Sequence, residues 1–221
     1  MNLRFTRYLY EYSQVKFSLK EAMLSKEREE VLFWTYELYH SGFQQDVWDW
    51  IRELYSTYYE QYHSKIKKQI DRMFVQWKET GDVCLIGTVA GTLSVLERRE
   101  DEIKKFIIVY KEDRHQTKPV TNPPYKYLEQ VSLYPIRIQT DTDSARIIRE
   151  AYLGPNWLYY CAETPIWWSR IQEHGGQIGE GQIVFGTDDD LEAFYDKWGF
   201  EPDEQSNQMH EIHGIHLASR H

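Results

Sequence analysis

The stretch "KEREEVLFWTYELYHSG", residues 26–42, decides the fold class of this chain. Its early glutamates suit the positive end of a helix dipole, and Gly42 stands where a helix commonly ends in a left-handed residue. Apolar side chains cover two sides of the predicted helix over 26–39: Val31, Trp34 and Leu38 on one, Leu32, Tyr36 and Tyr39 on the other. Because a helix that is apolar nearly all round has neighbours on two sides, we expect it at the centre of a helical stack.

The flanking segments also have helical periodicity. We expect helices over 13–24, capped by Ser13, over 44–61 and over 64–78, where Gly81 ends the last one. A rhythm of about 20 residues per helix is typical of stacked αα-hairpins. The residues themselves do not repeat, so the sequence predicts an irregular stack.

The apolar run "VCLIGTVAGTLSVL", residues 83–96, fits two structures. As a helix it would place Gly87 and Gly91 one turn apart, where they let a neighbour approach closely. As two strands it would turn at Ala90-Gly91. We favour the helix because it continues the helical rhythm, and we expect a further helix over 100–110.

The chain divides by composition into four parts. Residues 1–111 predict the helical stack, and 112–140 a proline-containing linker or long loop with one extended segment. Residues 141–200 predict a small helical region with a β-hairpin at 177–185, and Thr187 with Asp190 forms a capping box for its last helix. Residues 201–221 read as a polar, mobile tail. The expected fold class is mainly α: an irregular stack of αα-hairpins followed by a small α+β C-terminal region with one β-hairpin.

Composition bounds the class of protein. The chain has 221 residues, 41% of them hydrophobic and 28% charged, as in an ordinary globular protein. Two cysteines, Cys84 and Cys161, form no disulfide framework, which favours a reducing compartment. The run at 83–96 is shorter than the about 20 residues that span a bilayer. We expect a soluble, cytoplasmic protein with no membrane partner; its oligomeric state stays open.

Charge is concentrated at one end. The net charge is −9, and residues 141–221 contain 15 acidic and 5 basic side chains. This excess repels the phosphates of DNA or RNA from that part and leaves a partner protein with a basic surface open. Three adjacent acids, Asp188, Asp189 and Asp190, are the sharpest feature of the acidic part.

Aromatic residues are abundant: 8 Trp, 17 Tyr and 9 Phe. Tyrosine and tryptophan are enriched at protein interfaces because one end of each side chain is polar. Since adjacent helical residues point about 100° apart, we expect one Trp of each close pair in the core and the other at the surface. The predicted interaction surface consists of the three acids together with Trp48, Trp50, Tyr55, Tyr59, Trp167 and Trp168.

A second candidate surface is basic. Lys65, Lys68 and Arg72 follow one side of the predicted helix over 64–78, opposite its apolar side. They suit contact with phosphate or nucleic acid. The alternative is an ordinary solvated helix face, because Asp71 and Glu79 interrupt the charge.

Metal and catalytic sites find little support. His210, His213 and His216 recur every third residue and imidazole binds Zn²⁺, but Gly214 interrupts them and no cysteine is near. The acids at 188–190 splay apart on a helix and already suit its dipole. No nucleotide-binding loop or nucleophile elbow is present. We therefore expect no catalytic residue, metal or cofactor.

Three stretches resemble a known group of proteins: "LFWTYELYHSGF" (32–43), "NWLYYCAETPIWWSRI" (156–171) with the following "GGQIGEGQIVF", and "FYDKWGFEPDEQ" (194–205). The chain resembles an uncharacterised family encoded by nucleocytoplasmic large DNA viruses, the giant viruses, over most of its length up to Gln205. The resemblance implies a viral protein acting in the cytoplasm of an infected cell. It assigns no catalytic residues.

Three functions follow as hypotheses. The first is a non-enzymatic macromolecular interaction or scaffold protein. The second is a nucleic-acid-associated factor in viral transcription or translation, acting through Lys65, Lys68 and Arg72. The third is a metal-dependent enzyme that uses the acidic C-terminal third.

Overall fold

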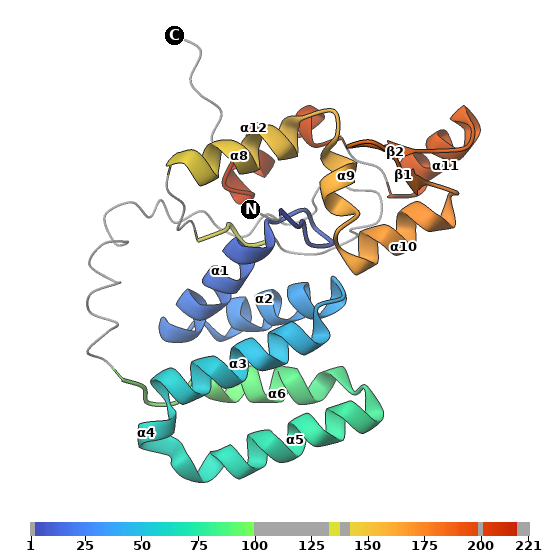
Figure 1. Ribbon diagram of the computed structural model, residues 1–221. Helices are drawn as coiled ribbons and strands as arrows, with labels where there is room; N and C mark the ends of the chain where they lie inside the picture. Colours follow the sequence, from blue (N-terminus) through green and yellow to red (C-terminus); the bar gives the residue numbers. More distant parts are fainter. Residues whose placement is uncertain (1–2, 100–132, 138–141, 199–200, 216–221) are drawn as a thin grey trace. The chain divides into compact units, whose positions relative to one another are not determined.

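The computed structural model describes residues 3–99, 133–137, 142–198 and 201–215. Helices dominate, with one two-stranded antiparallel sheet near the C-terminus (Figure 1), which confirms the mainly α fold class. The chain forms two compact units, which we call the middle unit, Lys16–Thr117, and the composite unit, Met1–Val15 with Lys118–His221. The first 15 residues thus group with the C-terminal part of the chain. The sequence predicted them as part of the helical stack, and that boundary is wrong.

The middle unit is built from a succession of helices. They are α1 (Tyr12–Leu24), which begins in the composite unit, α2 (Arg28–His40), α3 (Gln44–Tyr58), α4 (Glu60–His63), the 3-10 helix η1 (Ser64–Ile66), α5 (Lys67–Thr80) and α6 (Val83–Leu93). α2 packs against α3 and α6, and α5 packs against α6 (Figure 1). The helices expected over 44–61 and 64–78 are present as α3 and α5, with α4 and η1 between them.

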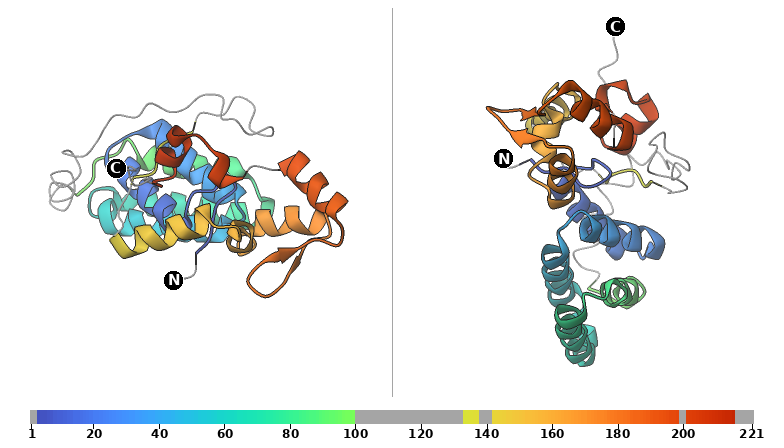
Figure 2. Two further views of the ribbon diagram at one scale, coloured as in Figure 1. Left: turned by 90° about the horizontal axis from the view of Figure 1, so that it is seen from above. Right: turned by 90° about the vertical axis from the view of Figure 1, so that its right-hand side faces the viewer.

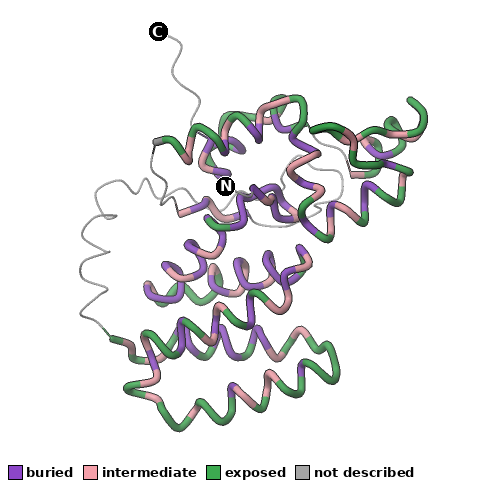
Figure 3. Tube along the Cα trace, in the orientation of Figure 1, coloured by how far each residue is buried: buried purple, intermediate pink, exposed green. Residues whose placement is uncertain are grey.

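α2 occupies the central position that its sequence predicts. Trp34 is fully buried, and Figure 3 shows α2 buried along much of its length, whereas α5 is largely exposed. The Tyr39 hydroxyl donates a hydrogen bond to the Gly81 carbonyl at 3.1 Å and accepts one from the Trp77 indole at 2.9 Å. The polar ends of these aromatic side chains are therefore satisfied inside the unit.

Residues 83–93 are helical, so the hairpin alternative for this run is wrong. Asp82 caps α6 by accepting a hydrogen bond from the Cys84 N–H at 2.8 Å. Gly87 faces α2 so closely that a Cβ added there would lie 2.0 Å from the Tyr36 hydroxyl oxygen. The close approach that we expected at Gly87 is confirmed.

α1 begins earlier than its sequence predicts. The Glu11 carboxylate accepts a hydrogen bond from the Gln14 N–H at 2.9 Å, so Glu11 caps the helix and Ser13 lies within its first turn. At the other end, Lys26 has a left-handed backbone with φ of 61°. The Glu27 N–H reaches back to the Ala22 carbonyl at 3.0 Å, the bond that closes a helix end of this kind.

The composite unit contains shorter elements. They are α8 (Thr142–Leu153), α9 (Trp157–Cys161), α10 (Pro165–Glu173), β1 (Gln177–Ile178), β2 (Ile183–Val184), α11 (Asp188–Trp198), the 3-10 helix η2 (Pro202–Glu204) and α12 (Asn207–Ile212). Gln177 pairs with Val184 and Ile178 with Ile183, which confirms the predicted hairpin. Figure 2 shows this hairpin beside α10 and α11. The expected helix over 100–110 and most of the 112–140 segment lie outside the described residues.

Residues 5–11, which we call the N-terminal loop, are held by distant parts of the composite unit. The Trp167 indole donates to the Thr6 carbonyl at 2.8 Å, and the Tyr10 hydroxyl donates to the Tyr134 carbonyl at 2.7 Å. Nε2 of His213 lies 2.7 Å from the Tyr8 carbonyl oxygen. The loop therefore depends on three segments that come much later in the chain.

Residues 201–215 differ from the polar, mobile tail that the sequence predicts. They form η2 and α12, and Met209, Ile212 and Ile215 are buried. Ser206 caps α12 by accepting a hydrogen bond from the Met209 N–H. The three apolar side chains recur at helical spacing, which charged and histidine residues between them conceal in the sequence.

Candidate interaction surface

Most of the aromatic side chains predicted at the surface lie in the core. Trp48 and Tyr59 are fully buried and Tyr55 nearly so. The Trp48 ring packs against Trp77, with ring centroids 5.7 Å apart. The Tyr55 hydroxyl donates to the His63 carbonyl at 3.0 Å. These side chains hold α3 in the middle unit and are not accessible to a partner, so their assignment to a surface is wrong.

Trp50 is half-buried and follows the expected division within its pair with Trp48. Its indole donates to the Lys16 carbonyl at 3.1 Å, and the Lys16 ammonium lies 4.3 Å from its ring centroid. Both interactions are within the middle unit. They attach α3 to α1, which gives Trp50 a structural role.

The pair in the composite unit divides in the same way. Trp167 is fully buried, packs edge-on against Trp157 and donates to the Thr6 carbonyl. Trp168 is half-buried. Within this pair, Trp168 therefore keeps part of its surface available to a partner.

The three adjacent acids form the first turn of α11. Asp188 and Asp189 are exposed, and Asp190 is half-buried. The Thr187 hydroxyl accepts a hydrogen bond from the Asp190 N–H at 3.2 Å, which confirms Thr187 as the cap of α11. The second bond between the two residues runs from the Thr187 hydroxyl to the Asp190 carboxylate at 2.7 Å, where the predicted capping box has the backbone N–H of Thr187 as donor. The charge of Asp190 thus serves the helix end.

The three predicted basic side chains are exposed along η1 and α5. Within the described residues, Lys65, Lys68 and Arg72 form no ion pair. Their neighbour Lys67 differs, because its ammonium lies 2.8 Å from the Asp71 carboxylate. The three cations therefore remain available on one side of α5, and we call them the cationic stripe.

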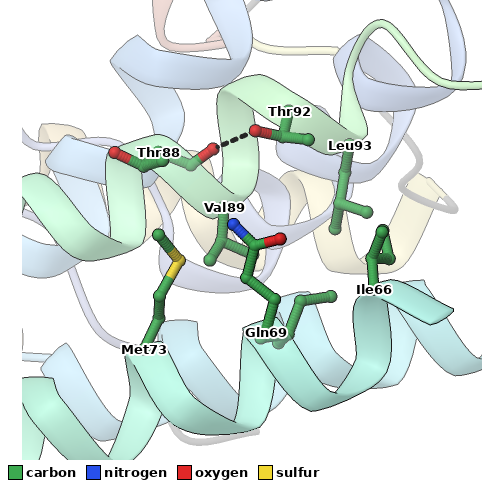
Figure 4. Close-up of a pocket in the computed structure, with 8 residues that line it drawn as sticks. Ile66, Gln69, Met73, Thr88, Val89, Thr92 and Leu93 are labelled. Atoms are coloured by element: carbon green, nitrogen blue, oxygen red, sulfur yellow. Dashed lines mark hydrogen bonds between the residues drawn. The ribbon is translucent and has the colours of Figure 1, made fainter.

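A shallow groove lies between α5 and α6 (Figure 4). Ile70, Val89 and Leu93 form its floor and are buried. The cavity is half-open to solvent and has a volume of about 40 Å³. It has room for the end of one aliphatic side chain of a partner.

The two walls of the groove differ in chemistry. Ile66, Gln69 and Met73 stand on the α5 side, and Thr88 and Thr92 stand on the α6 side (Figure 4). The Thr88 and Thr92 hydroxyls donate to carbonyls of their own helix at 2.8 and 2.7 Å. The hydroxyl hydrogens are thus already used, so the α6 wall is neutral and weakly polar.

Nothing in three comparisons, with family models, curated proteins and solved structures, matches this chain. Its resemblance to the giant-virus family remains a prediction. Along the described residues, each helix is either too short or too polar to cross a membrane.

Sequence reasoning found the cationic stripe and missed the groove. Periodicity identifies Ile70 and Met73 as the apolar face of α5, but it does not show how much of that face α6 covers. One signal was present: Thr88 and Thr92 interrupt the apolar run at 83–96 one turn apart. This spacing marks the exposed side of α6 next to its packed side.

The histidines of the tail lie in the packed part of the composite unit. His210 and His213 are buried, and burial lowers the pKa of His213 to about 4. Nδ1 of His213 lies 2.8 Å from the Met209 carbonyl oxygen and 3.2 Å from the Tyr152 hydroxyl. Within the described ranges, no three His, Cys, Asp or Glu side chains gather closely enough to hold a metal ion. His216 and His221 lie outside those ranges.

Proposed function

We propose that this protein is a non-enzymatic interaction or scaffold protein that binds another protein through the groove between α5 and α6. The observation that carries the proposal is the size and exposure of the groove. Small-molecule sites typically enclose about 300–1,000 Å³, whereas this cavity measures about 40 Å³. A cavity of this size suits a single anchoring side chain of a macromolecular partner.

The surroundings of the groove support a protein partner. Interfaces take most of their binding energy from a few apolar anchors in dry pockets, surrounded by polar contacts. Ile70, Val89 and Leu93 offer such a floor, and Gln69 and Thr88 offer a polar rim. The resemblance to the giant-virus family extends the proposal to a viral protein that acts in the cytoplasm of an infected cell.

One observation favours a second candidate, a nucleic-acid-associated factor. Lys65, Lys68 and Arg72 are exposed and form no ion pair within the described residues, so they are available to phosphate. We rank this candidate second because the groove beside them is apolar and Asp71 lies on the same helix. The metal-dependent enzyme remains a third hypothesis without a located site.

A capture experiment with a blocked groove tests the proposal. Thr88→Phe places a ring on the exposed wall, and Val75→Phe adds the same ring to α5 at a position 56% exposed and outside the groove lining. Wild type and Val75→Phe should capture proteins from a eukaryotic cell lysate, and nuclease treatment should not reduce this capture. Thr88→Phe should capture none of these proteins. Capture that nuclease abolishes would favour the second candidate, and equal capture by all three proteins would reject the groove.

A further inference from the structure

We infer that the occupant of the groove is an acidic amphipathic helix whose carboxylates face α5. The inference rests on the proposed function, since it names the chemistry of the partner at the same groove. Three features support it: the one-turn spacing of the residues along both walls of the groove, the position of the cationic stripe on α5 and the lack of charged side chains on α6.

The groove has helical spacing on both walls. Ile66, Gln69 and Met73 follow one another at about one turn, and Thr88 and Thr92 do the same across from them. At a rise of 1.5 Å per residue, the α5 wall extends roughly 10 Å, about two turns of a helix laid along it. An occupant with apolar side chains three and four residues apart can therefore place one of them in the cavity while the others pack along the α5 wall.

The charge beside the groove is one-sided. Lys65 and Arg72 are each one helical turn from Gln69, so they border the α5 wall on its outer side. Lys68 lies one turn from both. Lys68 points farther away from the groove, because it lies about 160° around the helix from Ile70. An occupant seated between Gln69 and Thr88 would meet the Lys65 ammonium and the Arg72 guanidinium along one edge, and carboxylates there would gain charge-assisted contacts.

The opposite edge offers no such contact. Residues 83–96 contain no charged side chain, and the Thr88 and Thr92 hydroxyls donate within α6. The neighbouring cations Arg52 and Lys67 are held by Asp71, at 3.5 and 2.8 Å. The pattern favours an occupant with an apolar row and one acidic flank, and it disfavours a basic or uniformly charged one.

Three synthetic peptides of identical length test this inference. Each carries leucine at positions i, i+4, i+7 and i+11 and a fluorescent label, and the remaining positions are mainly Glu, Gln or Lys. Fluorescence anisotropy with the full chain measures the Kd of each. We expect the Glu peptide to bind about fivefold more tightly than the Gln peptide, as two exposed ion pairs allow, and the Lys peptide to bind most weakly.

Matched variants locate the effect. Lys65→Gln, Lys68→Gln and Arg72→Gln together should bring the Glu peptide to the Kd of the Gln peptide. The control removes three other exposed cations, Lys26, Arg146 and Lys197, by the same change and should leave the preference intact. Thr88→Phe should abolish binding of all three peptides. Thermal melts of each variant confirm that it is folded.

The outcomes separate this inference from the proposed function. If Glu and Gln peptides bind equally well and Thr88→Phe abolishes both, the acidic occupant is refuted while the groove survives. If Thr88→Phe has no effect, both ideas fail. Absence of binding by all three peptides, or displacement of the Glu peptide by a single-stranded oligonucleotide, also overturns the inference. If light scattering shows that wild type self-associates and Thr88→Phe does not, the occupant of the groove is a second copy of this chain and the acidic helix is refuted.

Discussion

Gly87 and Gly91 lie one turn apart on α6, yet alanine should affect them in opposite directions. A Cβ at Gly87 would lie 2.0 Å from the Tyr36 hydroxyl oxygen and 2.8 Å from its Cζ, so the ring must move. A Cβ at Gly91 meets its nearest atom, Nε of Arg28, at 3.4 Å, which is ordinary contact. The two substitutions thus share a gain in helix propensity and differ in steric cost.

The magnitudes follow from these two terms. Replacing glycine by alanine within a helix stabilises by about 1 kcal/mol, and forcing extra volume into a packed contact costs about 1–3 kcal/mol. We therefore expect Gly87→Ala to lower the free energy of unfolding by about 1 kcal/mol. Gly91→Ala should raise it by up to about 1 kcal/mol.

Urea denaturation followed by circular dichroism measures both changes, and a double mutant isolates their cause. With Tyr36→Ala in the background the obstructing ring is gone, so Gly87→Ala should become stabilising by about 1 kcal/mol. A Gly87→Ala protein as stable as the Gly91→Ala protein would refute the packing argument. So would a Gly87→Ala penalty that persists without the Tyr36 ring.

Three further predictions concern other parts of the chain. Lys26→Gly should raise the free energy of unfolding by about 1 kcal/mol, because Lys26 has a left-handed backbone that glycine adopts freely. Lys20→Gly, within α1, should lower the free energy of unfolding by about the same amount, and urea denaturation of both variants measures the difference. Because the pKa of His213 is lower in the folded protein, the unfolded chain binds a proton there more readily. The free energy of unfolding should therefore fall by up to about 3 kcal/mol as the pH drops from 6.5 towards about 4. His213→Gln should reduce this dependence on pH in thermal melts across that range. Truncation after Gln205 removes buried side chains such as Met209 and should cost more than about 4 kcal/mol, so an unchanged melting temperature would contradict the packing of α12.

Much of the fold could be predicted because its signals are local. The apolar spacing of α5, the glycine that ends it and the cap that Thr187 gives α11 each depend on residues within a turn or two. Gly87 facing Tyr36 was also foreseeable, because a glycine within an apolar helix points to a close neighbour. Propensity and packing agree at these positions.

The misses share a different cause. Trp48 and Trp50 have similar local surroundings, and only the placement of α1 and α5 decides which one is buried. Likewise, the groove exists because α6 covers part of the α5 face and leaves Gln69 exposed. Glu11 shows the same limit at short range: its carboxylate caps α1 although Ser13 has the more typical capping side chain.

The N-terminal loop has a consequence for the order of events during synthesis. Thr6 and Tyr8 are held by Trp167 and His213, which are synthesised after the whole middle unit. The middle unit is continuous in sequence and can fold as soon as it emerges from the ribosome. Closing a long unstructured loop costs entropy that grows with its length. A middle unit that has already folded shortens that loop, so its folding should speed the completion of the composite unit. Until then the apolar side chains of the loop, such as Phe5, lack their folded environment, and exposed apolar surface of this kind favours aggregation.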